Sequence, residues 1–406
     1  MHYEIHLDIS DFSGKTISGF SILDITAKTK SLRSISLDLL QLDIDSIYSE
    51  GQKISNFTHN DTLLHVTLLN ILNPLDTVKI KVFYRGKPAV DPTGWGGFEF
   101  RTGIAYNLGV GFGADPHVFG RAWYPCIDDF IDRATYDYYI TTQKEHIAVC
   151  SGTQQSVTDS LEKKVYHWSL SDEIPTYLSS VAVSNYVAVR DTFKGVLGEI
   201  PIGIYAMPGD SSKAVSSFKN LKFMLHTFED AFGPYRWERV GYVATPRGAM
   251  EHVANIAIGT ISGKDQDNLI AHELAHHWFG NLITCYNAEE MWINEGWAVF
   301  CESVSKKGVN GHQAYMDYKR KKHYNVIKKE PFVDNFIPLI DVPHDKTYSF
   351  TVYQKGGDVV HSLRSYLGDS LFYSSVKSLL DTFAFKPISI YQVFLLQEKS
   401  QKMEFL

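Results

Sequence analysis

The residues with the clearest chemical potential lie in one short segment, His272-Glu273-Leu274-Ala275-His276. On a helix, side chains four positions apart share a face, so the imidazoles of His272 and His276 can bind one metal ion. Imidazole nitrogens at about 2.0–2.1 Å are typical ligands of Zn²⁺. Glu273 lies between the histidines, where its carboxylate reaches a water molecule on the metal rather than the metal itself. The segment therefore predicts a zinc site that activates water.

Glu295, in the segment Asn294-Glu295-Gly296, supplies a third ligand in this interpretation. A helix, a loop and a second helix can return its carboxylate to the metal. Two histidines, one glutamate and an open position for water form a ligand set of catalytic zinc. His277 competes for the metal, but on a helix it points about 100° away from His276, so we interpret it as a packing or supporting residue. In the alternative without a metal, the histidines belong to a core helix and Glu295 is a solvated acid.

The elements that position these residues lie in the second half of the chain, where apolar residues have helical spacing. Residues 218–232 carry large apolar side chains every three or four positions, and Gly233-Pro234 ends that pattern. Alternation of Ile200, Ile202 and Ile204 predicts a strand. We therefore expect a mainly helical zinc domain with a small sheet over residues 191–406. Further helices are expected over residues 268–279, 290–305, 358–367 and 369–383.

In the first half of the chain, apolar and polar residues alternate instead. Tyr3, Ile5, Leu7 and Ile9 are separated by polar residues, which is the pattern of a half-buried strand. We therefore expect an antiparallel β domain over residues 1–190, so that the whole chain is a multidomain α+β protein. Other strand-like runs, with turn residues between them, lie at residues 63–69, 78–84, 136–141 and 165–170.

The composition narrows the classes of protein to which this chain can belong. At about 150 residues per domain, a chain of 406 residues suggests two or three domains. Lys and Arg total 39 against 46 Asp and Glu, a net charge of −7, which disfavours a nucleic-acid-binding protein. The cysteines form no CxxC pair, so we expect buried thiols rather than a cysteine metal site. These cysteines are Cys126, Cys150, Cys285 and Cys301.

Neither a membrane span nor a signal peptide is predicted. The sequence has no run of about 18 apolar residues. The first residues, Met1-His2-Tyr3-Glu4, have neither the basic nor the apolar region of a signal peptide. The protein is therefore expected to be cytoplasmic, or extracytoplasmic if the chain begins after a removed signal.

Five segments together carry a family resemblance. They are His272–Asn281, Gly248-Ala249-Met250-Glu251-His252, Tyr353-Gln354-Lys355-Gly356, Trp123–Asp128 and Thr176–Leu178. The first three are similar to an HExxH zinc helix, a GxMEN exopeptidase motif and a Tyr-x-Lys-Gly segment. The others are similar to a Phe-Pro-Cys-x-Asp segment and to a stretch that closes an N-terminal domain. The chain thus resembles the M1 family of zinc aminopeptidases, the gluzincins that include aminopeptidase N and leukotriene A4 hydrolase.

The resemblance implies a fold and an activity. The fold would be a saddle-like antiparallel β domain followed by a thermolysin-like zinc-peptidase domain. One Zn²⁺ per chain would be held by His272, His276 and Glu295, and the protein would remove N-terminal residues from peptides that have a free N-terminus. We expect it to act as a monomer.

The same resemblance assigns roles to individual side chains. Glu273 would be the general base, and Tyr353 would donate a hydrogen bond to the developing oxyanion. Glu251 would bind the α-ammonium group of the substrate, because a blocked N-terminus would leave that buried carboxylate unpaired. The neighbouring residues of its segment would contact the substrate: Gly248, Ala249, Met250 and His252. Gly248 could instead mark a bend, and Met250 could be a core residue.

Three departures from the family pattern affect these expectations. His252 replaces the Asn that ends the usual motif. Pro116 falls near the place where the family carries a Gln or Glu that also holds the substrate amine, and Asp115 could substitute for it or form a turn. The chain also ends where the catalytic domain would end, so the helical C-terminal domain of the family is expected to be absent and the cleft more open, unless the chain is a fragment.

Other functions remain open. Endopeptidase activity would follow if Glu251 did not hold the amine. Nothing in the sequence selects for the epoxide hydrolase activity of leukotriene A4 hydrolase. A non-catalytic scaffold would be expected to lack the zinc ligands or Glu273, which this chain retains. The preferred N-terminal residue cannot be read from the spacing of the motifs.

Overall fold

The computed structural model describes residues 1–160 and 162–393, which fall into two compact units. The first unit consists of Met1–Ala188, Tyr205–Pro208 and Gly241–Thr260. The second consists of Val189–Ile204, Gly209–Val240 and the described residues from Ile261 onward. The domain boundary expected between residues 190 and 191 stays a prediction, and the expected domain end at residue 406 lies outside the described residues.

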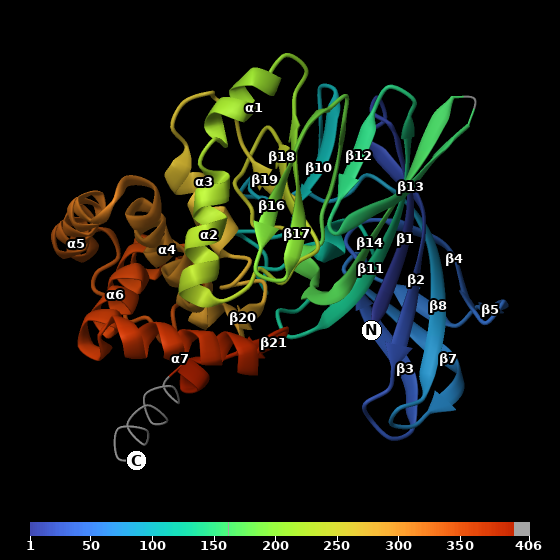
Figure 1. Ribbon diagram of the computed structural model, residues 1–406. Helices are drawn as coiled ribbons and strands as arrows, with labels where there is room; N and C mark the ends of the chain where they lie inside the picture. Colours follow the sequence, from blue (N-terminus) through green and yellow to red (C-terminus); the bar gives the residue numbers. More distant parts are fainter. Residues whose placement is uncertain (161, 394–406) are drawn as a thin grey trace. The chain divides into compact units, whose positions relative to one another are not determined.

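An eight-stranded sheet dominates the described part of the first unit, in the order β13-β14-β11-β1-β2-β8-β4-β5 (Figure 1). Strand β1 buries Tyr3, Ile5, Leu7 and Ile9 on one face, as its alternating pattern requires. It pairs in parallel with β11, whereas the other pairs of the sheet are antiparallel. The strands are β1 (His2–Asp11), β2 (Thr16–Thr26), β4 (Asp43–Ser49), β5 (Gln52–Ile54), β8 (Thr77–Gly86), β11 (Arg133–Gln143), β13 (Thr153–Asp159) and β14 (Lys163–Pro175).

Smaller sheets complete the first unit. One has the order β12-β15-β10-β9 and another the order β3-β7-β6, while β18 pairs in parallel with β19. The strands are β3 (Leu32–Asp38), β6 (Phe57–His59), β7 (Leu63–Leu72), β9 (Gly97–Arg101), β10 (Ile104–Leu108), β12 (Ile147–Cys150), β15 (Val181–Ser184), β18 (Val240–Ala244) and β19 (Ile256–Ile258).

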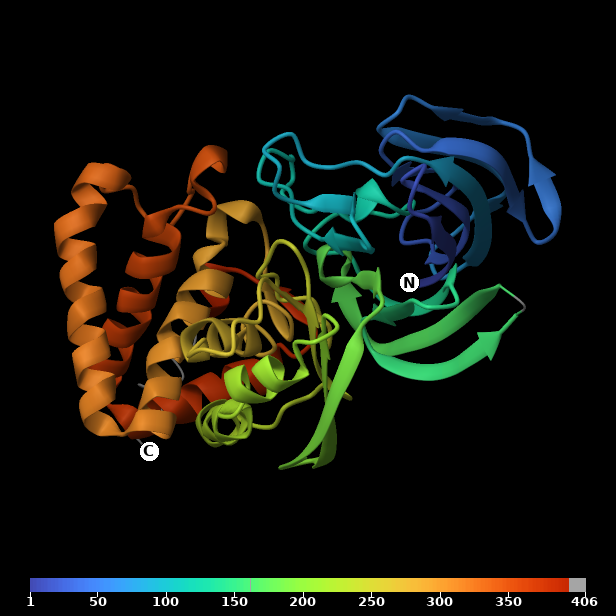
Figure 2. The ribbon, with the colours of Figure 1, turned by 90° about the horizontal axis from the view of Figure 1, so that it is seen from above.

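The second unit is mainly helical. Helix α4 is its centre: it is buried from Trp292 to Ser305 and packs against α3, α5 and α6 (Figure 2). The helices are α1 (Ser211–Ser217), α2 (Leu221–Phe232), α3 (Asp267–Ala275), α4 (Trp292–Asn310), α5 (His312–Val333), α6 (Gly356–Leu367) and α7 (Asp369–Thr382). The strands that lie largely or wholly in this unit are β16 (Val187–Gly195), β17 (Gly198–Ala206), β20 (Ile283–Cys285) and β21 (Lys386–Ile388).

Several helices differ from the sequence-based expectation: α1 was not expected, α4 extends to Asn310 rather than to residue 305, and α3 and α5 differ for reasons that the structure shows. Helix α3 ends at Ala275 rather than at residue 279, because the chain turns back there: the Asn281 N–H donates to the His276 carbonyl at 2.9 Å, and Gly280 adopts a φ of +122°. Helix α5 was not expected, because its buried side chains include the charged residues Lys319 and Glu330. An apolar periodicity cannot reveal such a face.

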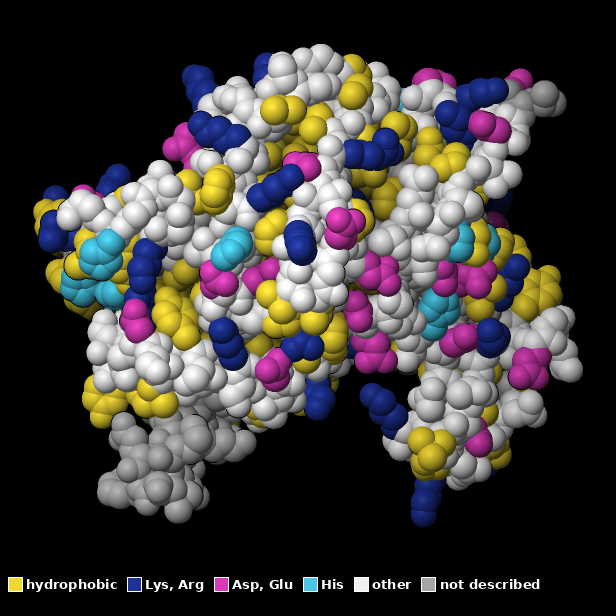
Figure 3. Space-filling model, in the orientation of Figure 1, with side chains coloured by type: hydrophobic (Ala, Val, Ile, Leu, Met, Phe, Trp, Pro, Cys, Tyr) yellow, Lys and Arg dark blue, Asp and Glu magenta, His cyan; other side chains and the backbone are white. Residues whose placement is uncertain are grey.

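The surface mixes both signs of charge. On the face visible in Figure 3, acidic and basic side chains are interspersed. Within the described residues, no helix has the length and hydropathy needed to cross a membrane.

Candidate metal centre

Three side chains of the second unit converge on one point. His272 lies in the last turn of α3, His276 follows the end of that helix, and Glu295 lies in the first turn of α4. Nε2 of His272 is 3.2 Å from Oε2 of Glu295 and 3.3 Å from Nε2 of His276. Nε2 of His276 is 3.4 Å from the same Glu295 oxygen. All three residues are buried.

These separations fit a tetrahedral zinc ion. Ligands about 2.0–2.1 Å from a tetrahedral centre lie about 3.3–3.4 Å from one another. The three donor atoms therefore have the spacing of three corners of a zinc tetrahedron, and two imidazoles with one carboxylate are a suitable donor set.

The protein itself orients both imidazoles. Nδ1 of His276 donates to the carbonyl oxygen of Phe279 at 2.9 Å, because a carbonyl can only accept. Nδ1 of His272 donates to Oε1 of Glu302 at 3.0 Å. Each Nε2 is therefore left with a lone pair directed at the shared point, which is the tautomer that a metal ligand needs.

The electrostatic environment keeps Glu295 ionised. Burial by itself raises the pKa of this carboxyl, but His276 and His272, when protons on Nε2 stand in for the metal ion, outweigh burial and lower its pKa. A charged carboxylate is an acceptor with no hydrogen of its own, so it is ready to bind a cation.

Glu302 is a residue of this site that the sequence analysis missed. It lies on α4 seven positions after Glu295, which places both carboxylates on one face of the helix. Its second oxygen accepts a short hydrogen bond from the Tyr318 hydroxyl and lies 3.1 Å from Nζ of Lys322. Burial raises the pKa of Glu302, but His272 and Lys322 outweigh it and the pKa is lowered. The seven-residue spacing between Glu295 and Glu302 was the feature of the sequence that could have identified Glu302 as part of this site.

Glu273 and Tyr353 lie at the same site. A carboxylate oxygen of Glu273 is within 4.8 Å of a ring nitrogen of His276. Tyr353 lies in η5 (Thr351–Lys355), a π-helical turn, and its hydroxyl donates to Oε1 of Glu295 at 2.9 Å. Its ring is nearly parallel to that of His272, with 6.0 Å between the ring centroids. The structure thus brings together both expected catalytic residues and the three expected ligands.

His277 turns away from this cluster. Its ring stacks on Tyr235 with 5.5 Å between the ring centroids and meets Trp237 edge-on. Burial lowers the pKa of His277 to about 3, so the imidazole is neutral. These contacts are those of a packing residue.

The expected substrate-binding segment belongs to the first unit. The N–H of Met250 donates to the Ala257 carbonyl, and the Ala257 N–H donates to the Met250 carbonyl, both at 2.9 Å. Met250 and Glu251 are buried, whereas Ala249 is half-buried. A Cβ on Gly248 would lie 2.9 Å from the Gly259 nitrogen, so the backbone there leaves no room for a side chain.

His252, which stands in place of the usual Asn, is fully buried in the first unit. Its Nε2 accepts a hydrogen bond from the Gly109 N–H at 3.1 Å. Burial lowers its pKa to about 3, so the imidazole stays neutral. Pro116, the other departure, lies in a segment whose carbonyl oxygens accept hydrogen bonds from Nη2 of Arg121, at 3.2 Å for Asp115 and 3.0 Å for Pro116.

Comparison with known sequences agrees with this architecture. Residues 1–178 match the peptidase M1 N-terminal domain, and residues 216–403 match the peptidase family M1 domain. The chain belongs to peptidase family M1. This family of zinc metallopeptidases implies zinc at the site.

Relatives with curated names are distant in sequence. Leucine aminopeptidase 2 of Yarrowia lipolytica is 26% identical over 412 residues, which cover 94% of this chain and 61% of that protein. Leukotriene A-4 hydrolase of Xenopus laevis is 25% identical over 425 residues, which cover 96% of this chain and 64% of that protein. The chain therefore spans about three fifths of the length of these relatives.

Solved structures confirm the fold. A two-domain M1 zinc metallopeptidase superposes with a TM-score of 0.88 at 23% identity, over 98% of this chain and 90% of its own. The M1 zinc metallopeptidase from Deinococcus radiodurans gives 0.85 at 24% identity, over 100% and 91% of the two chains. The expected α+β architecture, a β domain followed by a mainly helical peptidase domain, is thereby confirmed.

Proposed function

We propose that the protein is a zinc-dependent aminopeptidase that binds one Zn²⁺ through His272, His276 and Glu295. The observation that carries the proposal is the convergence of three donor atoms at 3.2–3.4 Å, with the Tyr353 hydroxyl on the same carboxylate. The leucine aminopeptidases among the relatives support the reaction class.

Each residue around the ion has a separate role in the reaction. Zinc, when bound, supplies a Lewis acid that polarises the scissile carbonyl and makes water more acidic. Glu273 accepts a proton from the attacking water and passes it to the nitrogen of the leaving amine. Tyr353 donates a hydrogen bond to the oxygen on which negative charge develops.

The restriction to N-terminal residues is assigned to Glu251. Its carboxylate pairs with the free α-ammonium group of the peptide, and an acetylated N-terminus leaves that buried charge without a partner. Gly248, Ala249, Met250 and His252 belong to the same segment, and we assign them to substrate binding. The substrates are thus peptides with a free N-terminus, and the protein acts as a monomer.

A panel of aminoacyl fluorogenic substrates with free and acetylated N-termini tests this proposal. Wild type should cleave only the free substrates and retain about one equivalent of zinc. Glu273→Gln should keep the zinc and lose roughly 10²–10⁴-fold in kcat. Glu251→Ala should lose the preference for free over acetylated substrates. Equal cleavage of both substrate types by wild type would instead indicate an endopeptidase, and full activity of Glu273→Gln would contradict the mechanism.

A further inference from the structure

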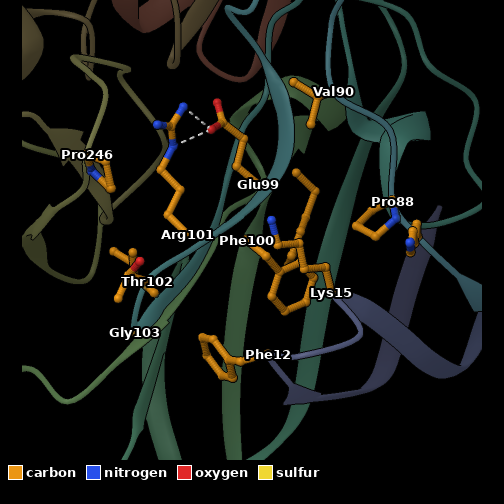
Figure 4. A pocket seen from close by; sticks show the side chains of 13 residues that line it. Phe12, Lys15, Pro88, Val90, Glu99, Phe100, Arg101, Thr102, Gly103 and Pro246 are labelled. Atoms are coloured by element: carbon orange, nitrogen blue, oxygen red, sulfur yellow. Dashed lines mark hydrogen bonds and ion pairs between the residues drawn. The ribbon is translucent and has the colours of Figure 1, made fainter.

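A hollow that is separate from the metal centre lies wholly within the first unit. It has a volume of about 840 Å³ and is formed by the β1–β2 turn, the segment after β8, strand β9 and Pro246 (Figure 4). This volume lies within the range of about 300–1,000 Å³ that small-molecule sites occupy. None of the residues assigned above to zinc, catalysis or substrate binding lines it.

One wall of the hollow is aromatic. Phe98, Phe100 and Ile104 are buried at 1%, 9% and 3% exposure. Phe12, from the β1–β2 turn, meets Phe100 edge-on with 5.6 Å between the ring centroids (Figure 4). An apolar ligand group placed here would cover the exposed part of the Phe12 ring, which is half-buried.

The charges that line the hollow are unbalanced. Glu99, the acidic residue of the lining, is already neutralised: its Oε2 accepts from Nε and Nη2 of Arg101, each at 2.6 Å (Figure 4). Its Oε1 also lies 3.8 Å from Nε of Arg247. Lys15 and Lys87 are exposed, and neither has a hydrogen-bond or ion-pair partner among the residues that the structure describes. The hollow therefore carries an excess of positive charge in a chain whose net charge is −7.

We propose that this hollow binds an amphipathic carboxylate. The aromatic or branched aliphatic body packs against Phe12 and Phe100, and the carboxylate faces Lys15 and Lys87. Because both lysines are exposed, each ion pair contributes little, so most of the affinity comes from the apolar body. This balance favours an acid with one charge and a large apolar group over a polar, multiply charged phosphate compound. A free organic acid and the C-terminal residue of a peptide share this chemistry.

Isothermal titration calorimetry of the full chain tests the proposal. The probes are N-acetyl-phenylalanine and its amide, which have nearly the same size and differ in charge. Their blocked nitrogen also keeps them from being aminopeptidase substrates. We expect the carboxylate to bind roughly 2- to 30-fold more tightly than the amide, which is the effect of two exposed ion pairs. The double variant Lys15→Gln/Lys87→Gln should remove this difference, and Phe12→Ser should weaken both probes.

Three comparisons make the result specific. The variant Lys30→Gln/Lys53→Gln changes the net charge equally at exposed positions outside the hollow and should keep the wild-type preference. Binding should survive removal of metal by a chelator, which separates this site from the zinc site and from the proposed peptidase activity. An N-acetylated tripeptide ending in Phe distinguishes the sources: tighter binding than N-acetyl-phenylalanine indicates a peptide C-terminus, and weaker binding indicates a free acid.

The proposal is overturned by several results. These are the absence of binding, equal affinity for acid and amide, loss of binding on chelation, or an unchanged preference in Lys15→Gln/Lys87→Gln.

Discussion

Glu302 links His272, one of the expected metal ligands, to helix α5. It accepts from Nδ1 of His272 and from the Tyr318 hydroxyl, and it lies 3.1 Å from Nζ of Lys322. A carboxylate behind a ligating histidine fixes the orientation of the ring and raises its basicity as a ligand. We therefore propose that Glu302 positions His272 for the metal and is not itself a ligand.

Glu302→Gln should weaken zinc binding by roughly 10- to 100-fold, since the amide can still accept from His272 but no longer carries charge. Competition with a chromogenic chelator measures the affinity. Glu289→Gln, an exposed acid in the same unit, makes the matching change away from the site and should bind zinc as wild type does. Equal affinities in all three proteins would contradict this role.

His252→Gln should change the pH dependence of stability. The pKa of His252 is about 3 in the folded protein and about 6.5 in an unfolded chain. As pH falls below 6.5, the unfolded chain gains a proton that the folded protein excludes, so this group lowers stability by about 2 kcal/mol at pH 5. Glutamine can still accept from the Gly109 N–H and does not titrate.

Urea denaturation at pH 7 and pH 5 measures this effect. Wild type should lose about 2 kcal/mol more than His252→Gln between the two pH values. His65→Gln, at an exposed position of the first unit, should behave as wild type. If His252→Gln and wild type lost the same free energy of unfolding, burial of a neutral imidazole would not be the cause.

At the scale of elements, the C-terminal end of α5 holds the turn that carries Tyr353. Oδ2 of Asp334 accepts from the Thr351 N–H at 2.8 Å and from its hydroxyl at 2.9 Å. Nζ of Lys355 donates to Oε1 of Glu330 at 2.8 Å. Both ends of the π-helical turn are thus fixed by one helix, which places the Tyr353 hydroxyl on Glu295.

Asp334→Ala should reduce kcat roughly 10- to 100-fold while zinc content stays unchanged, because a small misplacement of a catalytic donor is costly. In a Tyr353→Phe background the same substitution should have little further effect, since residues that act as a unit are not additive. Asp317→Ala, an exposed acid on α5, is the matched control. Additive losses would indicate that Asp334 does not act through Tyr353.

At the scale of the whole molecule, the three proposed metal ligands belong to one unit. His272, His276 and Glu295 all lie in the second unit and connect α3 to α4. A ligand that binds only the folded form stabilises the elements that hold it. The first unit contributes none of the three proposed ligands.

Chelation should therefore increase hydrogen exchange in α3 and α4 while the strands β1 and β11 keep their protection. Mass spectrometry of peptides from zinc-loaded and chelated protein measures both regions. Readdition of zinc should restore the exchange of the helices. Uniform deprotection of both units would show that the metal stabilises the chain globally.

Much of the fold was predicted from patterns between residues that are close along the chain. The alternation of β1, the helical spacing of α2 and the histidines four positions apart depend on neighbours along the chain, so their periods are visible in the sequence. These patterns were sufficient to predict the confirmed α+β fold and to name candidate ligands. Helix α5 was not predicted, because charged residues lie on its buried face. The end of α3 was predicted wrongly, because it depends on the turn at Gly280.

Sequence spacing by itself thus determined the candidate donors His272 and His276, because helical periodicity converts a separation of four residues into a shared face. Glu295 was a candidate from its distance along the chain, but it lies on another helix, so its place beside the histidines depends on how α3 and α4 pack. Only the tertiary structure decided what supports and surrounds them. The contacts of Glu302 with Tyr318 and of Asp334 with Thr351, and the hollow lined by Phe12 and Phe100, join residues of different elements. No local period encodes such contacts, because the packing of whole elements creates them.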